Sequence, residues 1–476
     1  MPKKDNLKIF LKSFENKKII IWGLGLNFGG LEAVKFFAKK IKSAEITVLD
    51  LKSKAELTKS LKEIKCYKNV KVVLGRQEEK DFLGADLVIK NPAIPWELAL
   101  VKKLQSKNIR IETDITLFFK FFKGKIIGIT GSKGKTTTTT LIGQLLKKGG
   151  KDVFLGGNIR VSLFAYLKES ILENRRKIAV LELSSFQLED LFYAKRSPEI
   201  AVVTNVLRDH LNRYGTMKKY LEAKKLIVLF QQKSDFLVLN EQDKNQKIIQ
   251  KNILSSKFYF SSKKLVGSRG VSLESEPLSF LIKGTGKKEL FKVNNPFFSQ
   301  PHNAQSLGLA LIVCRLILGV SEKLLEKEVN SFEGVPYRME KIREISGVAF
   351  YNDTTATIPD ATIGNLALFS SKVILISGGS DKNLKFERFA QVVSRKAKKV
   401  ILLPGNITAV IRQKIKKLNP KISCIDVKNM REGVHKAFEN AKKGDVIILS
   451  PGCTSFGLFK NEFDRGDQFN KEVADL

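Results

Sequence analysis

The sequence predicts an α/β protein made of three consecutive domains. It has 476 residues, and a usual domain size of about 100–200 residues gives two to four domains. Short apolar runs alternate with amphipathic helical patterns along most of the chain, which is typical of parallel β-α-β units. Changes in this pattern near residues 115 and 335 predict the domains 1–114, 115–334 and 335–476.

The composition is that of an ordinary folded protein with a large positive charge. Hydrophobic residues make up 43% of the chain and charged residues 28%, close to the average for globular proteins. The formal net charge is +36, yet no run of five like charges occurs. This scattered pattern favours lysines spread over a solvated surface. A nucleic-acid footprint and a role toward acidic substrates stay open as alternatives.

Nothing in the sequence predicts a membrane span or a disulfide framework. The best apolar run, 307–320, is interrupted by Arg315 and is shorter than the roughly 18–20 residues that cross a bilayer. Residues 1–18 have no apolar stretch of the kind found in secretory signals, so we expect a cytoplasmic protein. The four cysteines form no C-x-x-C pair, which favours reduced thiols over a zinc site.

In the first domain, the predicted strands are 19–22, 46–50, 70–74 and 87–89, with a helix over 31–40. The first strand runs into a glycine-rich turn that is one residue longer than the dinucleotide-binding fingerprint, Gly23-Leu24-Gly25-Leu26-Asn27-Phe28-Gly29. Such a turn can bring backbone N–H groups close to a phosphate. A glycine turn without a ligand is the alternative.

In the second domain, strands are predicted at 126–130, 178–183, 200–204 and 236–239, and a helix over 303–318. The strongest motif follows the first of them, Gly131-Ser132-Lys133-Gly134-Lys135-Thr136-Thr137. A glycine loop that leads into a helix N-terminus can hold phosphate oxygens. Lys135 would reach the β- and γ-phosphates, and Thr136 would bind Mg²⁺. Ile129 stands where the strict pattern has glycine, so this is a variant P-loop.

Three more residues of this domain are candidates for catalysis. Glu182 ends an apolar strand, where a carboxylate is costly unless it is paired or binds metal. His210 follows the strand 200–204, at a position where catalytic loops gather. Lys224 falls in a helical segment and is, by itself, typical of a surface lysine. The stretch 240–300 is rich in Ser and Lys, with short β-like pieces and no functional signal. In the third domain the predicted strands are 348–351, 373–376, 400–403 and 446–449.

These motifs together resemble the Mur ligases, ATP-dependent amide ligases of peptidoglycan precursor synthesis. The order of the P-loop, the Glu182 strand, Asp209-His210, Ala223-Lys224, His302-Asn303 and Arg338 is that of the family. The segments 182–188 and 449–455 are similar to the members that add D-glutamate. Further similarity at 156–159, 336–340, 351–357, 378–382 and 459–466 extends the resemblance over nearly the whole chain.

The resemblance implies a Rossmann-like first domain, a P-loop ATPase-like second domain and a Rossmann-like third domain. It also implies a reaction that joins D-glutamate to UDP-N-acetylmuramoyl-L-alanine through an acyl phosphate, in a cytoplasmic monomer that binds ATP and two Mg²⁺ ions. The implied catalytic residues are Lys135, Glu182, His210 and Lys224. The implied metal ligands are Thr136, Glu182, His210 and Lys224, the last of these as a carbamate.

The remaining roles that the resemblance implies concern the three substrates. ATP would contact Gly131, Ser132, Lys133, Gly134, Lys135, Thr136, Thr137, Asn303, Arg338 and Asp353. The UDP-substrate would contact Leu26, Asn27, Leu51, Lys52, Asn158 and Gln187. D-Glutamate would contact Thr357, Lys382 and Ser455.

The chain departs from the family pattern at four places. Ser306 replaces an asparagine that contacts adenine, and Thr355 replaces a lysine near the phosphates. Asn212 precedes Arg213 where an aspartate is usual, and an aromatic residue is displaced to Phe463. Three other functions stay open: a related ligase that adds another amino acid, a catalytically weakened relative, and a nucleic-acid-dependent NTPase. The last would need aromatic platforms in a basic groove.

Overall fold

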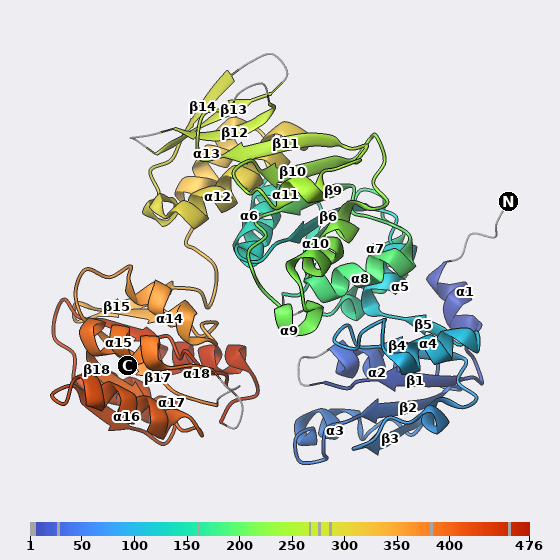
Figure 1. Ribbon diagram of the computed structural model, residues 1–476, viewed down its shortest axis with the longest axis horizontal. Coiled ribbons are helices and arrows are strands. Elements are labelled where there is room, and N and C mark those ends of the chain that lie inside the picture. Colours follow the sequence, from blue (N-terminus) through green and yellow to red (C-terminus); the bar gives the residue numbers. More distant parts are fainter. Residues whose placement is uncertain are drawn as a thin grey trace. The chain divides into compact units, whose positions relative to one another are not determined.

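Three β-sheets with helices on their faces form the molecule, which confirms the predicted class of three α/β domains (Figure 1). The structure is a computed structural model that describes residues 6–25, 29–159, 161–265, 268–274, 278–284, 288–380, 384–455 and 458–476. The chain forms two compact units: the first ends at Phe332 and holds two sheets, and the second begins at Glu333. The predicted boundary near 115 therefore falls inside the first unit, and the exact domain limits stay predictions.

The N-terminal sheet is parallel, with the strand order β3-β2-β1-β4-β5. All four predicted strands are present, and β5 is an additional one. The strands are β1 (Lys18–Trp22), β2 (Glu45–Asp50), β3 (Val70–Leu74), β4 (Leu87–Lys90) and β5 (Arg110–Glu112). The helices are α1 (Leu7–Lys12), α2 (Gly29–Lys40), α3 (Thr58–Ile64), α4 (Ala99–Ser106) and α5 (Asp114–Phe121).

Residues of β1 alternate between two hydrophobic clusters because successive side chains of a strand point to opposite faces. Ile19 and Ile21 pack in the same cluster as α2, whereas Ile20 and Trp22 pack in the cluster that contains α4. The cluster of α2 does not end at the N-terminal sheet. It continues through α5 into the central sheet, so the first two domains share one hydrophobic core.

The central sheet has nine strands in the order β14-β13-β12-β11-β10-β9-β6-β8-β7. The strands from β7 to β12 pair in parallel, while β13 and β14 add antiparallel hairpins. The predicted strands correspond to β6 (Lys125–Thr130), β8 (Ile178–Glu182), β9 (Ile200–Val203) and β10 (Phe236–Asn240). The others are β7 (Val153–Gly157), β11 (Ser256–Ser261), β12 (Gly270–Glu274), β13 (Ser279–Lys283) and β14 (Lys288–Lys292).

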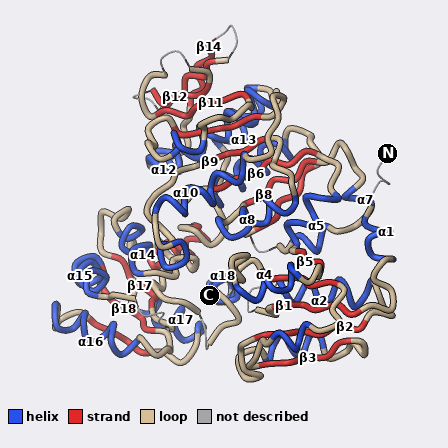
Figure 2. The backbone as a smooth tube through the Cα atoms, turned by 45° about the vertical axis from the view of Figure 1, so that its right-hand side comes forward, coloured by secondary structure: helices blue, strands red, loops and turns tan. Residues whose placement is uncertain are grey.

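Helices cover the two faces of the central sheet (Figure 2). One face packs against α8 and α10, and the other against α6 and α12. The helices are α6 (Lys135–Lys148), α7 (Glu169–Leu172), α8 (Ser185–Ala194), α9 (Leu211–Tyr214), α10 (Met217–Lys225), α11 (Gln246–Ile249), α12 (Pro301–Leu311) and α13 (Glu322–Asn330). The helix predicted over 303–318 is α12 followed by a π-helical segment, Ile312–Ile317.

The second unit has a six-stranded sheet in the order β15-β16-β20-β17-β18-β19, parallel except for the β15–β16 pair. Its strands are β15 (Glu340–Ile345), β16 (Val348–Asn352), β17 (Val373–Ser377), β18 (Ala397–Leu402), β19 (Ser423–Asp426) and β20 (Val446–Leu449). Its helices are α14 (Pro359–Leu366), α15 (Glu387–Lys396), α16 (Thr408–Leu418), α17 (Met430–Glu439) and α18 (Glu462–Ala474). Both of its hydrophobic clusters contain only residues of this unit.

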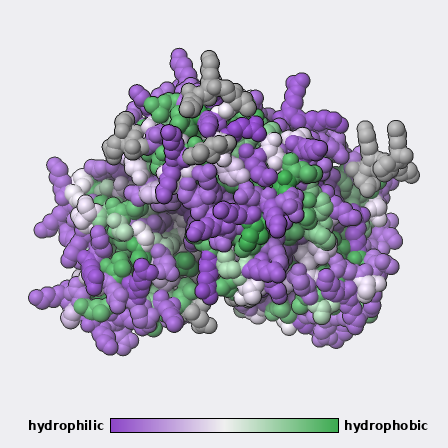
Figure 3. All heavy atoms as spheres, turned by 45° about the horizontal axis from the view of Figure 1, so that its top comes forward, coloured by the Kyte–Doolittle hydropathy of each residue, from purple (hydrophilic) through white to green (hydrophobic). Residues whose placement is uncertain are grey.

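The face of the molecule in Figure 3 is mainly hydrophilic, with hydrophobic residues in small groups between polar ones. Among the described residues, no helix combines the length and the apolar character needed to cross a membrane.

Candidate active site

The P-loop lies between β6 and α6, and its backbone is fixed by the neighbouring strand end. The Ser132 amide donates to the Asn205 carbonyl at 2.8 Å, and the Lys133 amide donates to Asn205 Oδ1 at 2.9 Å. Gly131 has φ +147°, and a Cβ built on it would lie 1.9 Å from Thr204 Oγ1. Only glycine fits there. The loop leads into the N-terminus of α6 at Gly134, where a helix dipole favours an anion.

Two residues that were predicted to act together, Thr136 and Glu182, are hydrogen-bonded. The Thr136 hydroxyl donates to Glu182 Oε2 at 2.7 Å, and Asn158 Nδ2 donates to the other carboxylate oxygen at 3.0 Å. Glu182 is only 2% exposed, so these bonds offset the cost of burying its charge. Lys135 Nζ lies over its own loop, donating to the carbonyls of Gly131 and Ser132 at 3.0 and 3.2 Å.

Lys224 is not a surface lysine, because α10 places its side chain inside the protein beside the P-loop. It is 1% exposed, and its Nζ donates to Thr130 Oγ1 and to the Gly131 carbonyl, both at 3.0 Å. Burial, with the positive charge of Lys135 as the next cause, holds its pKa well below the usual value. The amine is therefore poised to lose its proton, a state in which lysine nitrogen is a nucleophile.

His210 lies at the start of α9 with a left-handed backbone, φ +51°. Its side chain is 42% exposed, and Nε2 lies 3.6 Å from Asp209 Oδ2. The Phe186 ring of α8 lies edge-on to the imidazole at 5.2 Å. Partial burial lowers the pKa of His210, which favours the neutral form that can bind a metal ion.

The predicted UDP end of the site lies at the carboxyl edge of the N-terminal sheet. Asp50, at the end of β2, accepts from the amides of Gly25 and Lys52, both at 2.9 Å. Leu51 is 63% exposed. Of the residues predicted to contact the UDP-substrate, Leu26 and Asn27 lie outside the described residues. Gln187 completes a capping box with Ser184 at the start of α8.

In the second unit, the ends of β16, β17 and β20 meet at one edge of the sheet. Asp353 is 2% exposed and accepts from Ser450 Oγ at 2.7 Å and Asn365 Nδ2 at 2.6 Å. Burial raises its pKa to about 6. Ser455 is 3% exposed, and its hydroxyl oxygen has no hydrogen-bond partner among the described residues, as expected for a group that awaits a ligand.

The other predicted residues of this unit are placed as follows. Thr357 follows Asp353 in the loop after β16 and is partly exposed, and Arg338 lies in an exposed turn before β15. Lys382, predicted to contact D-glutamate, lies outside the described residues. In the first unit, Asn303 Nδ2 donates to the Phe297 carbonyl at 2.9 Å. Ser306 Oγ lies 3.5 Å from the Cβ position built on Gly134, so α12 borders the P-loop.

Sequence reasoning missed the residues that hold the loops in place. Asn205 and Thr204 fix the P-loop, and Tyr220 OH lies 3.0 Å from Ser132 Oγ. Arg465, fully buried, donates to the carbonyls of Thr354 and Cys453. Local patterns in a sequence carry no signal for such pairs, which are 71 or more residues apart for the P-loop.

The donor set beside the P-loop fits Mg²⁺. The carboxylate of Glu182 and the hydroxyl of Thr136 are hard oxygen donors, which Mg²⁺ prefers. The described residues contain no cluster of three His, Cys, Asp or Glu side chains that could hold a metal by themselves. Further ligands would therefore come from nucleotide phosphates, water and a modified Lys224.

The fold and site define a three-domain α/β protein with a variant P-loop. Three family models match it in order: "Mur ligase MurD-like, N-terminal domain" at residues 17–113, "Mur ligase middle domain" at 129–314 and "Mur ligase, glutamate ligase domain" at 337–453. Among curated proteins, the "UDP-N-acetylmuramoylalanine--D-glutamate ligase" of Clostridium botulinum (strain Alaska E43 / Type E3) is 34% identical, over 99% of this chain and 100% of its own. The enzyme of the same name from Roseiflexus sp. (strain RS-1) is 32% identical, over 96% and 98%.

Solved structures share the fold. Thermotoga maritima UDP-N-acetylmuramate-alanine ligase MurC aligns with a TM-score of 0.57 at 19% identity, over 96% of this chain and 99% of its own. The MurF ligase of the same organism, solved in complex with ADP, aligns with a TM-score of 0.54 at 18% identity, over 90% and 95%. The chain belongs to the Mur ligase family, the ATP-dependent amide ligases of peptidoglycan precursor synthesis. The predicted family, fold class and reaction class are thus confirmed, whereas the residue roles stay predictions.

Proposed function

We propose that this ligase joins D-glutamate to UDP-N-acetylmuramoyl-L-alanine, with ATP as the energy source and Mg²⁺ as the metal. The amino acid and the acceptor are those in the names of the full-length relatives. The reaction class is supported by the P-loop, where a nucleotide-binding turn, the Thr136–Glu182 pair and the buried amine of Lys224 lie together. That arrangement is the observation that carries the proposal.

The chemistry explains why these residues are needed. A carboxylate is a poor electrophile, so the terminal L-alanine carboxylate first takes the γ-phosphate of ATP, and ADP leaves. The D-glutamate amine then attacks the acyl carbon, and phosphate and a proton leave. ATP and the carboxylate are both anions. The Lys135 ammonium and the N-terminus of α6 would offset their repulsion and stabilise the charge of the transition state.

Thr136 and Glu182 would hold one Mg²⁺ and His210 a second, and these ions would supply Lewis-acid stabilisation of the transferring phosphoryl group. Lys224 would join them only after reaction with CO₂, because an ammonium cannot bind a metal ion. In that step the neutral amine forms a carbamate and releases a proton. The burial of Lys224 next to Lys135 favours the neutral amine that this step requires. Asn158 would hold the muramoyl-alanine part, beside the Glu182 carboxylate to which its amide donates.

In the second unit, Asp353 and Arg338 would contact ATP, and Thr357, Lys382 and Ser455 would hold D-glutamate. The Ser455 hydroxyl, which has no partner within the described part of the chain, supports this role. Positioning three substrates together can lower the barrier by about 7–11 kcal/mol.

The decisive experiment is a phosphate-release assay with ATP, UDP-N-acetylmuramoyl-L-alanine and a panel of D- and L-amino acids. We expect release that depends on D-glutamate. Release with L-alanine, a diamino acid or a dipeptide instead would assign the chain to a different Mur ligase activity. No release with any amino acid would identify a catalytically weakened relative. The departures from the family pattern at Ser306 and Thr355 would then be the first positions to test.

A further inference from the structure

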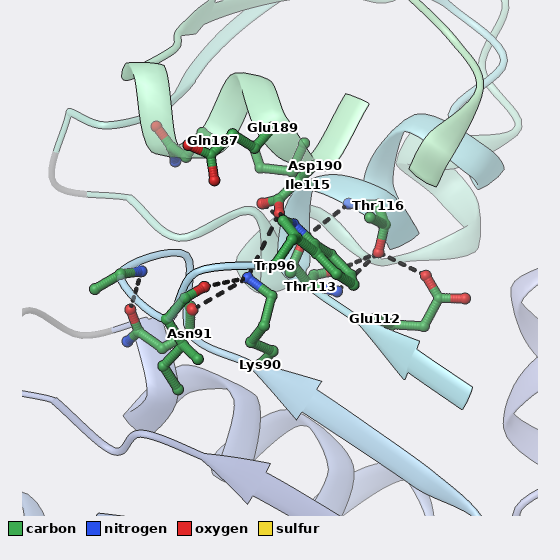
Figure 4. Close-up of polar contacts among 12 residues, drawn as sticks. Lys90, Asn91, Trp96, Glu112, Thr113, Ile115, Thr116, Gln187, Glu189 and Asp190 are labelled. Carbon is green, nitrogen blue, oxygen red and sulfur yellow. Dashed lines mark hydrogen bonds and ion pairs between the residues drawn. The ribbon is translucent and has the colours of Figure 1, made fainter. Parts of the chain in front are cut away.

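A carboxylate of α8, Asp190, lies at the centre of a buried polar network between the N-terminal and central domains (Figure 4). The side chain has no exposed surface. Its Oδ1 accepts from Trp96 Nε1 at 2.8 Å, and its Oδ2 accepts from Thr113 Oγ1 at 3.0 Å. Lys90 Nζ lies 3.8 Å from Oδ1. One residue of the central domain thus contacts the end of β4, the loop after it and the N-cap of α5.

The segment 90–96 folds so that its backbone and the Trp96 ring contact the ammonium of Lys90. This side chain is fully buried, and its Nζ donates to the Ile94 carbonyl at 2.9 Å and lies 4.4 Å from the centre of the Trp96 ring. Trp96 in turn stacks on Tyr193 of α8 at 3.6 Å. A buried charge is costly without a partner. Asp190 is the carboxylate that balances the charge of Lys90. The conformation of the segment 90–96 therefore depends on α8.

The acidic residue before Asp190 in α8, Glu189, is linked to the same segment through Arg213 of α9. Arg213 donates to Glu189 Oε2 at 2.9 Å and to the Ala93 carbonyl at 3.0 Å. Tyr214 OH donates to Glu189 Oε1 at 2.8 Å. Asp190 therefore contacts the segment 90–96 directly, whereas Glu189 is linked to it through Arg213 of α9. Helix α9 begins directly after His210.

Both ends of this network adjoin the expected path of the UDP-substrate. Lys90, Asn91 and Pro92 line a small cavity at the carboxyl edge of the N-terminal sheet, together with glycines of the turn after β1. At the other end, α8 begins at the Ser184–Gln187 capping box, three residues after Glu182. A substrate that spans from the N-terminal sheet to the P-loop must contact both the segment 90–96 and the start of α8. Its binding therefore depends on the distance between these two elements.

We propose that Asp190 is a positioning residue, which fixes the segment 90–96 relative to α8 and so sets the affinity for the UDP-sugar substrate without touching it. The inference rests on the proposed function. Burial raises the pKa of Asp190 to about 6, which leaves the carboxylate ionised and able to balance Lys90 at neutral pH.

The test compares Asp190→Asn with a matched control, Glu112→Gln, in the full-length enzyme. Glu112 is also buried, at 2% exposure, but in the described structure its side-chain partners are Arg110, Thr116 and Lys120, none of them on α8. We expect Asp190→Asn to raise the KM for UDP-N-acetylmuramoyl-L-alanine about tenfold, which corresponds to about 1.4 kcal/mol. In Asp190→Asn the KM values for ATP and D-glutamate should change less than about twofold. In Glu112→Gln the KM values for all three substrates should change less than about twofold.

Two results would overturn the proposal: an unchanged KM for the UDP-substrate in Asp190→Asn, or an equal rise in Glu112→Gln. If Asp190→Asn does not fold, Trp96→Phe removes one donor and keeps the stack on Tyr193, and the same selective rise in KM is expected. Hydrogen exchange of the segment 90–96 gives an activity-independent readout, with faster exchange in Asp190→Asn than in Glu112→Gln. Wild-type enzyme that releases no phosphate with D-glutamate would instead refute the proposed function, and the exchange experiment would still decide whether Asp190 fixes the segment.

Discussion

The surroundings of Lys224 determine whether its amine is charged, and only the neutral amine can react with CO₂ to form a carbamate. The amine is buried against Thr130 and Gly131. We expect Lys224→Ala to lower kcat by about a hundredfold or more, as loss of a group that stabilises the transition state does. Short carboxylates such as formate should restore part of the activity by taking the place of a carbamate. Lys224→Arg keeps a positive charge but cannot be carbamylated, and should show no rescue. Absence of rescue in both variants would count against the carbamate.

Lys135 is expected to act on phosphate and to contribute little to folding, because its Nζ donates to carbonyls of its own loop. Lys135→Ala should abolish ADP formation, with circular dichroism and thermal unfolding close to wild type. Lys147→Ala, an exposed position in the last turn of the same helix, serves as the control and should keep full activity. ADP formation at the wild-type rate in Lys135→Ala would refute the P-loop assignment.

Asp190 should make the stability of the enzyme depend on pH. Its pKa is raised from 3.8 to about 6, chiefly by burial, although Lys90 opposes the rise and Asp114 adds to it. The folded state therefore holds this proton more tightly than the unfolded state, so the stabilisation is present at low pH and falls as pH rises from about 4 to about 6. The free energy of unfolding of wild type, relative to Asp190→Asn, should fall over that range and stay level above it. Urea unfolding at several pH values checks this; a difference that rises with pH would contradict it.

At the scale of loops and helices, glycine geometry explains why the P-loop tolerates little change. A Cβ on Gly131 would meet Thr204 Oγ1 at 1.9 Å, whereas a Cβ on Gly150, also with positive φ, would meet no atom of the described residues within 4 Å. We expect Gly131→Ala to cost about 2–4 kcal/mol from strain and overlap together, and to weaken ADP binding strongly. Gly150→Ala should cost only about 1–2 kcal/mol of backbone strain and leave ADP binding unchanged. Titration calorimetry with ADP distinguishes the two variants, and equal affinities would show that the loop adapts.

The strands that could be predicted from the sequence are those with long apolar runs. Val446–Leu449 was predicted to the residue, because strands buried in a parallel sheet are nearly continuous in apolar residues. Val70–Leu74 was also predicted to the residue, although it is an edge strand, contains Lys71 and is only partly buried. Strand β5 was not predicted because it has only three residues. The region of β11–β14 was predicted only to contain short β-like pieces, since its apolar residues are mixed with polar and charged ones.

Site residues could be predicted where the residue type and its place in a local pattern indicate a chemical role. Glu182 could be inferred from the cost of a charge in an apolar strand, and its two hydrogen bonds agree with that reasoning. Asp190 could not, because an acidic residue in a helix is ordinarily solvated. Its burial results from the packing of α8 on the N-terminal domain, a tertiary contact between residues up to 94 positions apart.

At the scale of the whole molecule, the excess of 36 positive charges exceeds what the site can use. Four basic residues, Lys52, Lys135, Arg338 and Lys382, are expected to face the anionic substrates. Many of the remaining lysines lie on exposed surface, often paired with single carboxylates as in Lys71–Glu45 and Lys436–Glu439. Such exposed pairs contribute little to stability. The charge therefore reflects the surface composition and needs no nucleic-acid partner.

The distribution of hydrophobic clusters predicts how the chain divides on unfolding. The second unit has two clusters made only of its own residues, so a fragment of residues 333–476 should fold alone. A fragment of residues 1–114 should not, because its main cluster is completed by central-domain residues such as Phe164, Leu188 and Tyr220. Expression of the two fragments, followed by thermal unfolding monitored by circular dichroism, checks both expectations. A fragment 1–114 that unfolds cooperatively would show that the shared core is dispensable, and would make the polar contacts of Asp190 the main link between the first two domains.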